Sequence, residues 1–146
     1  MSKTAEQFLT DLRRLRGELD GMERRMADLA SGARLNALDI QALELVLETP
    51  GLRSGRLAAA LSVVPTTASS TVTRLRQRGL LSVRPDPADR RAVTLWLTPD
   101  GRRVSETLRE ETLARVDAAL AHLRSDERER LISLFARVAR VSEASA

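Results

Sequence analysis

Apolar residues recur in alternating steps of three and four along the first thirty positions of the chain. Residues three and four apart share a helix face, so this spacing predicts one long amphipathic helix from Thr4 to about Ala30. A helix of about 26 residues is about 39 Å long, which is too long and too narrow for the core of one small domain. We therefore expect it to pack against another helix or a second subunit. The stripe consists of Ala5, Phe8, Leu12, Leu15, Leu19, Met22, Met26 and Leu29.

Three shorter helices are predicted next. Apolar residues on one side indicate a helix over Asp39–Glu48, and the Thr-Pro-Gly sequence after it ends that helix. Ser54 has the side chain of an N-cap, which predicts a short helix behind it. A tight Ser-Val-Val turn leads to a further helix, which begins at Pro65 and stops before Gly79. Two helices joined by so short a turn predict a helix-turn-helix.

A β-hairpin and two long helices complete the pattern. Apolar residues lead in at 80–83, and residues 92–98 alternate between apolar and polar, while two prolines and two aspartates between them predict a turn. Amphipathic helices are expected from Pro99 to about Leu123, capped by Thr98, and again behind a Ser125 cap. The predicted organisation is an N-terminal helix at 1–34 and C-terminal helices at 99–146, which together suit dimerisation, around a lobe at 35–98 that holds the helix-turn-helix and the hairpin.

The formal net charge is +4, and all of it lies in one segment. Residues 62–98 hold six arginines against two aspartates, whereas the segments 1–30, 31–61 and 99–146 each hold equal numbers of basic and acidic side chains. A cationic segment between balanced ones favours a surface for a polyanion, because phosphates attract arginine and binding releases their counterions. A solvated arginine-rich face is the alternative that charge alone leaves open.

The helix that begins at Pro65 has short hydrogen-bonding side chains on its outward face, which suits entry into a DNA major groove. Arg74, on the same helix, would contact phosphate or pair with Asp89. Arg53 and Ser54 fall where the preceding helix would meet a phosphate, although they equally fit a surface residue and a cap. The candidates for base edges or phosphates on the outward face are Thr66, Thr67, Ser69, Ser70 and Thr73.

Two motifs together resemble the winged helix-turn-helix of MarR-type (multiple antibiotic resistance regulator) transcription factors. The first is LAAALSVVPTTASSTVTRLRQRGLL, and the second is DPADRRAVTLWLTPDG, with an Asp-x-Arg, alternating apolar residues and Leu-Thr-x-x-Gly. The resemblance implies a mostly α fold with a small β-hairpin wing, flanked by long dimerisation helices. It further implies that Arg91 is the wing arginine that enters the minor groove. Arg84 and Arg90 would contact the DNA backbone, and Asp89 would either orient an arginine or form the turn.

The family resemblance also sets the expected partners. It implies a homodimeric repressor on a pseudo-palindromic operator, regulated by a small lipophilic or aromatic ligand between the helical layer and the DNA lobe. Two alternatives stay open: a helical adaptor whose basic lobe is incidental, and a sequence-tolerant architectural DNA binder.

Catalysis and membrane insertion are not expected. The chain has no cysteine and a single histidine, His122, and it has no glycine-rich phosphate loop, so neither an enzyme nor a cofactor or metal site is predicted. No apolar run approaches the length of a membrane span, and the N-terminus is too charged for a secretory signal. We therefore expect a cytoplasmic protein.

Overall fold

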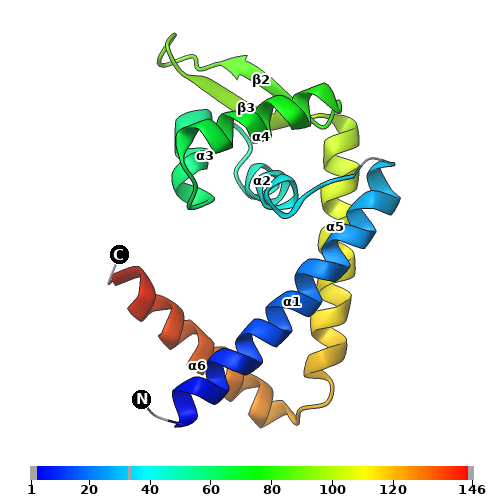
Figure 1. Ribbon diagram of the computed structural model, residues 1–146, viewed down its shortest axis with the longest axis vertical. Helices are drawn as coiled ribbons and strands as arrows, with labels where there is room; N and C mark the ends of the chain where they lie inside the picture. The colour runs from blue at the N-terminus through cyan, green and yellow to red at the C-terminus, as the bar shows by residue number, and fades with distance from the viewer. Residues whose placement is uncertain (1–2, 33, 145–146) are drawn as a thin grey trace. The chain divides into compact units, whose positions relative to one another are not determined.

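The computed structural model describes residues 3–32 and 34–144, which contain six helices and one three-stranded antiparallel sheet (Figure 1). The predicted class, mostly α with a small β wing, is therefore confirmed. The chain divides into two compact units, one ending at Glu110 and the other beginning at Glu111. Each unit is described separately below.

The long N-terminal helix is present as α1 (Lys3–Ser31). In its first half the apolar stripe faces solvent: Phe8, Leu12 and Leu15 are each between 38% and 50% exposed. Toward its end α1 contacts α2, and Ala27 is fully buried. The side chains of the last three stripe residues, Met22, Met26 and Leu29, fall outside what the structure describes.

Helix α2 (Ala37–Glu48) begins two residues before the predicted start at Asp39. The reason is a capping box: Asn36 Oδ1 accepts the Asp39 N–H at 2.9 Å, and Asp39 Oδ2 accepts the Asn36 N–H at 3.0 Å. These bonds satisfy N–H groups that a helix start would otherwise leave without partners, so the helix begins where they form.

A short strand, β1 (Leu52–Arg53), follows α2 and was not predicted, because two residues are too few to show an alternating pattern. Helix α3 (Ser54–Ala60) comes next, and its N-cap is Arg53 rather than the predicted Ser54. Arg53 has extended backbone angles as the last residue of β1, so helical geometry starts one residue later. Ser54 therefore occupies the first helical position.

Helix α4 (Pro65–Gln77) has the predicted start and stop. Val64 is the N-cap, and Pro65 occupies the first turn, where its missing N–H costs no hydrogen bond. At the other end Gly79 takes φ +70°. The Gly79 N–H then bonds to Arg76 O at 2.9 Å and the Leu80 N–H to Leu75 O at 3.0 Å, which is a Schellman motif.

The predicted hairpin consists of β2 (Leu81–Pro85) and β3 (Val93–Leu97), paired antiparallel over their full lengths. β1 pairs with the other edge of β3, which gives the strand order β1-β3-β2. Leu95, on the central strand, is fully buried. The hairpin is thus attached to the core through β3, while its tip extends beyond the sheet (Figure 1).

A single aliphatic core holds the elements of the first unit together. Each helix of the lobe and each strand of the hairpin contributes at least one fully or almost fully buried side chain. Burying one such side chain is worth about 1.5–3 kcal/mol. This core fixes α4 and the hairpin on a common base. Its largest fully buried apolar members are Ile40, Leu43, Val46, Leu57, Leu75, Leu95, Val104 and Leu108.

Helix α5 (Pro99–Leu120) begins at the Leu-Thr-x-x-Gly motif. Thr98 Oγ1 accepts the Gly101 N–H at 3.0 Å, which confirms the predicted cap, and it donates to Gly79 O at 2.6 Å. A Cβ at Gly101 would lie 1.9 Å from Leu80 O, so only glycine allows this approach. The motif therefore joins the end of α4 to the start of α5.

The second unit contains the end of α5 and all of α6 (Ser125–Ala144). α5 ends at Leu120, three residues before the predicted Leu123. Ser125 was predicted as the cap of the last helix, but Glu127 Oε2 accepts the Arg124 N–H at 2.9 Å, which makes Arg124 the capping position. Large apolar side chains on both helices are exposed, namely Leu113, Val116, Ile132, Leu134, Phe135 and Val138.

Candidate nucleic-acid interface

Helix α4 has a polar exposed face and a small-residue buried face. Ala68, Thr71 and Leu75 are buried against the lobe. Of the five predicted contact residues on the outward face, four are exposed and Thr67 is half-buried. The exposed members are Thr66, Ser69, Ser70 and Thr73.

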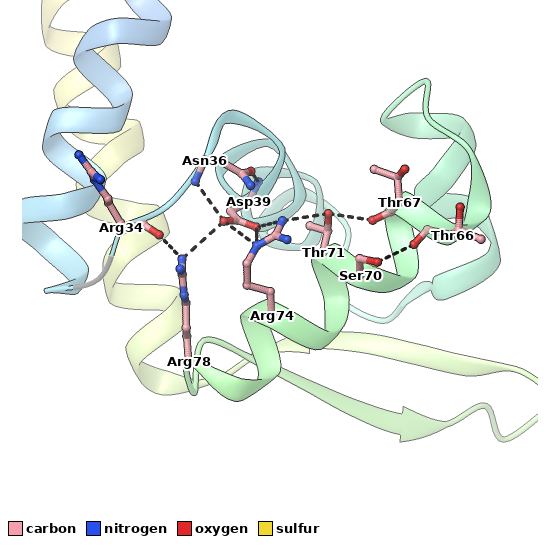
Figure 2. Close-up of polar contacts among 9 residues, drawn as sticks. All are labelled: Arg34, Asn36, Asp39, Thr66, Thr67, Ser70, Thr71, Arg74 and Arg78. Atoms are coloured by element: carbon pink, nitrogen blue, oxygen red, sulfur yellow. Dashed lines mark hydrogen bonds and ion pairs between the residues drawn. The ribbon is translucent and has the colours of Figure 1, made fainter.

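Two hydroxyl groups of α4 donate to its own backbone. Ser70 Oγ donates to Thr66 O at 2.9 Å, and Thr71 Oγ1 donates to Thr67 O at 3.0 Å (Figure 2). This is the four-residue back-bonding that hydroxyl side chains adopt inside helices. In this arrangement Ser70 offers a partner its oxygen lone pairs, which suits a donor such as a base amino group.

The side chain of Arg74 is directed into the protein. Its Nε and Nη2 donate to the carboxylate of Asp39 at 2.9 Å and 2.6 Å, and Nη2 also lies 3.3 Å from Thr71 Oγ1 (Figure 2). The hydrogen bonds to Asp39 raise the pKa of the Arg74 guanidinium above its already high ordinary value. The predicted pairing of Arg74 with Asp89 is therefore wrong, because a buried carboxylate on α2 takes that place.

Arg78, at the C-cap of α4, reaches the same carboxylate. Its Nη1 lies 3.5 Å from Asp39 Oδ2 and also donates to the backbone carbonyl of Arg34, in the segment before α2 (Figure 2). Asp39 is 1% exposed and so meets both arginines out of water. One carboxylate thus joins the last two turns of α4 to the start of α2.

At the tip of the hairpin, Asp89 forms a turn. Its Oδ1 accepts the Arg91 N–H at 3.0 Å, and its carbonyl accepts the Ala92 N–H at 2.9 Å. This is the turn-forming role that the sequence left open beside an arginine-orienting one. Arg90 and Arg91 are exposed, and no carboxylate in the described part of the chain lies within ion-pair distance of either.

Arg53 is bound to the wing. Its Nε lies 2.6 Å from Oδ2 of Asp86, whose Oδ1 accepts the Ala88 N–H at 2.8 Å. The backbone bond from Ala88 and the charge of Arg53 together hold the pKa of Asp86 below its ordinary value. With Ser54 half-buried at the first position of α3, the two predicted phosphate contacts lie at the junction between β1, α3 and the wing.

Arg84 lies over the ring of Trp96, with its Cζ 4.7 Å from the ring centroid. The indole Nε1 donates to Thr94 Oγ1 at 2.9 Å, and that hydroxyl donates to Arg84 O at 3.2 Å. Gly51 also packs against the ring, so closely that a Cβ there would be 2.9 Å from Cζ2. The guanidinium of Arg84 is therefore held at the base of the wing by a cation–π contact.

A groove of about 390 Å³ separates α4 from the hairpin. Ser69, Thr73 and Arg76 line it from α4, and Val83 and Val93 line it from the strands. The exposed polar face of α4 therefore lies beside the strands of the wing.

Three residues of this region were not predicted from the sequence, namely Asp39, Asp86 and Arg78. A signal for Asp39 was available, because Asn36-x-x-Asp39 has the spacing of a capping box. Nothing in the local pattern pointed to Asp86, which meets its arginine 33 positions away.

The described residues show neither a metal site nor a membrane span. No group of three or more His, Asp or Glu side chains among them is placed to hold a metal ion. No helix in the described part of the chain combines the length and the apolar character that crossing a membrane requires.

Comparison with known proteins identifies related chains and folds. The sequence model of the MarR family matches residues 35–93. The uncharacterized HTH-type transcriptional regulator YybA of Bacillus subtilis (strain 168) is 32% identical over 123 residues, which are 81% of this chain and 82% of that protein.

Two solved structures share the fold over most of the chain. Streptococcus pneumoniae FabT in complex with DNA has a TM-score of 0.84 at 16% identity, covering 97% of this chain and 99% of that one. NadR in complex with 4-hydroxyphenylacetate has a TM-score of 0.72 at 25% identity, covering 90% and 92%.

Proposed function

The chain belongs to the MarR family of transcription regulators, and from this premise we propose that it is a sequence-specific repressor that binds a pseudo-palindromic operator as a homodimer. The observation that carries the proposal is the wing: Arg90 and Arg91 are exposed at its tip, and the strands of the same hairpin face the polar side of α4 across a groove. A helix with short polar side chains fits the DNA major groove, and a cationic loop on the neighbouring hairpin can reach the minor groove at the same time.

The proposed contacts follow the exposed surface. Thr66, Ser69, Ser70 and Thr73 face the major groove, and Thr67 at the side of α4 meets its rim. Arg91 enters the minor groove, while Arg84 and Arg90 contact phosphates. Arg53, Arg74 and Asp89 support this surface through the internal bonds described above. Ser54, half-buried at the start of α3, stays a proposed phosphate contact.

The homodimer is proposed from exposed apolar surface. Residues 1–34 and 99–146 would supply the dimerisation helices, and 35–98 the DNA-reading lobe. Exposed Phe8 and Leu15 on α1, and Ile132 and Phe135 on α6, are large apolar side chains of the kind that oligomer interfaces cover. A two-fold dimer would present its two α4 helices to half-sites about 34 Å apart.

Regulation is proposed to come from a small aromatic or lipophilic ligand. NadR was solved with 4-hydroxyphenylacetate, an aromatic acid, and this chain shares its fold. Such a ligand needs only to bind better to the form in which the two α4 helices are wrongly spaced for DNA. Operator affinity would then fall as the ligand concentration rises.

Fluorescence anisotropy titrations against an own-promoter duplex and a random duplex, at low and physiological salt, test the proposal. We expect the promoter to be preferred by about a thousandfold and affinity to fall steeply with salt. Arg91→Ala should lose most of the affinity and reduce the salt slope by about 1. Arg14→Ala, which removes an exposed arginine from α1, is the matched control and should bind normally.

Two results would reject the proposal. Equal affinity for both duplexes would indicate a sequence-tolerant architectural DNA binder. No binding to either duplex at low salt would mean that the cationic lobe is a solvated face, and would favour a helical adaptor.

A further inference from the structure

We propose that Asp39 is the positioning residue of the recognition helix α4: its buried carboxylate holds Arg74 and Arg78 and so sets the orientation in which α4 meets DNA. The inference rests on the proposed DNA-binding function and adds to it a residue that never touches the nucleic acid. Arg74 accordingly binds Asp39 within the protein and does not contact a DNA phosphate.

The carboxylate of Asp39 has three partners: two arginines at the end of α4 and the backbone N–H that precedes α2. Arg74 donates through Nε and Nη2, the Asn36 N–H donates at 3.0 Å, and Arg78 Nη1 lies 3.5 Å away (Figure 2). A carboxylate that is 1% exposed needs such partners, because an unpaired charge out of water is strongly disfavoured. The site is therefore built to hold an arginine fork in one geometry.

The buried face of α4 carries one large apolar side chain. The buried residues of α4 are Ala68, Thr71 and Leu75, of which two have small side chains. Small side chains bury little apolar surface, so they contribute little to holding the helix in one orientation. The paired fork of Arg74 supplies the directional contact that fixes the rotation of α4 about its axis.

Arg78 extends the same anchor to the chain that enters α2. It donates to the backbone carbonyl of Arg34, so Asp39, Arg78 and the segment at 34–36 form one connected group (Figure 2). The position of α4 is thus tied both to the first turn of α2 and to the segment that precedes it.

The test compares Asp39→Asn, Arg74→Gln and the double variant in promoter-duplex titrations over a range of salt concentrations. In Asp39→Asn the side-chain amide oxygen would still accept the Asn36 N–H, so the capping box is kept while the charge is removed. We expect each single variant to lose about tenfold in affinity, which corresponds to about 1.4 kcal/mol, and the double variant to lose no more than either. The slope of log affinity against log salt should equal that of the wild type, whereas Arg91→Ala lowers it by about 1.

Arg74→Lys gives a second, independent readout. Lysine keeps the positive charge that a phosphate accepts but lacks the fork that the carboxylate binds. We expect Arg74→Lys to bind DNA as weakly as Arg74→Gln. This comparison distinguishes a phosphate contact of Arg74 from its pairing with Asp39, even if Asp39→Asn does not fold. Thermal melts would show that each variant is folded at the titration temperature. If Asp39 and Arg74 served only the stability of the fold, these folded variants would bind the duplex with wild-type affinity.

The inference is overturned if Arg74→Gln lowers the salt slope by about 1 while Arg74→Lys binds like the wild type, because Arg74 is then a phosphate contact. It is also overturned if folded Asp39→Asn binds with wild-type affinity. In both cases wild-type binding to the promoter still stands. Failure of the wild-type protein to bind any duplex would instead reject the DNA-binding function, and this inference with it.

Discussion

Arg53 and Asp86 form an ion pair, 2.6 Å between Nε and Oδ2, that fastens β1 to the residue where the hairpin leaves β2. Arg53 is about half exposed, whereas the side chain of Asp86 is only 8% exposed. The pair therefore anchors the base of the wing to β1. It also makes the wing sensitive to the charge of one carboxylate.

Acid should weaken the protein through Asp86. Its pKa is lower in the folded chain than the ordinary value of 3.8, so between these two values the unfolded chain takes up the proton first. The stability that Asp86 contributes is thus present above pH 3.8 and is lost as the pH falls through the folded pKa. Urea unfolding of the wild type and Asp86→Asn from pH 6 to pH 3 measures this. The stability advantage of the wild type should shrink on acidification, and a constant difference would contradict the prediction.

Gly101→Ala should destabilise the lobe strongly. A Cβ there would lie 1.9 Å from Leu80 O, a backbone atom that also accepts the Thr98 N–H at 3.2 Å. Relieving the clash must move the junction of α4 and α5, so we expect a loss of about 1–3 kcal/mol in the free energy of unfolding. Gly55→Ala is the control: it meets open space in α3 and should gain up to about 1 kcal/mol. Equal effects of the two substitutions in urea unfolding would rule out this explanation.

DNA binding should change the fluorescence of Trp96, the single tryptophan of the chain. Arg84 lies 4.7 Å from its ring centroid and is a proposed phosphate contact, so binding should draw the guanidinium away from the ring. We expect the emission change on adding operator to disappear in Arg84→Gln, measured at saturating DNA. It should persist in Arg90→Gln, which removes a wing arginine that does not touch Trp96. The same emission change in both variants would show that Trp96 senses something other than Arg84.

The dimer should depend on the apolar face of α6. Phe135 is 48% exposed, and a charge in its place would be buried by any partner that covers this face. We expect Phe135→Glu to sediment as a monomer and to lose the operator affinity that a second half-site provides. Ser133→Glu places the same charge on the opposite side of the helix and should remain dimeric. A monomeric wild type would remove the basis of the prediction.

Local sequence signals were sufficient for the helices of the lobe and for its hairpin, but not for the two-residue strand β1. Pro65 and Gly79 mark the limits of α4 because each acts through its own backbone. The alternation of apolar and polar residues over 92–98 marks β3, whose central residue Leu95 is fully buried. Predicted helix boundaries were wrong where the capping hydrogen bond came from a neighbouring residue. Arg124, for example, occupies the cap of α6 because Glu127 reaches back to its N–H.

Contacts between distant residues could not be predicted in this way. Arg74 meets Asp39 across 35 positions, and the pairing needs α2 and α4 to cross at a particular place. From charge alone, Asp89 on the wing was an equally reasonable partner. The residues of the outward face were easier to identify, because the periodicity of a helix defines which side chains point away from its core.

Helix α4 has two separate sets of side chains, one that binds α2 and one that is exposed. The anchor to α2 is made by Arg74 and Arg78, and the exposed face that includes Thr66, Ser69 and Thr73 takes no part in it. Substitutions on that face leave the anchor intact, so new base preferences can arise one residue at a time. Natural evolution or directed selection could therefore change the operator preference by substitutions on the exposed face while the position of α4 is kept.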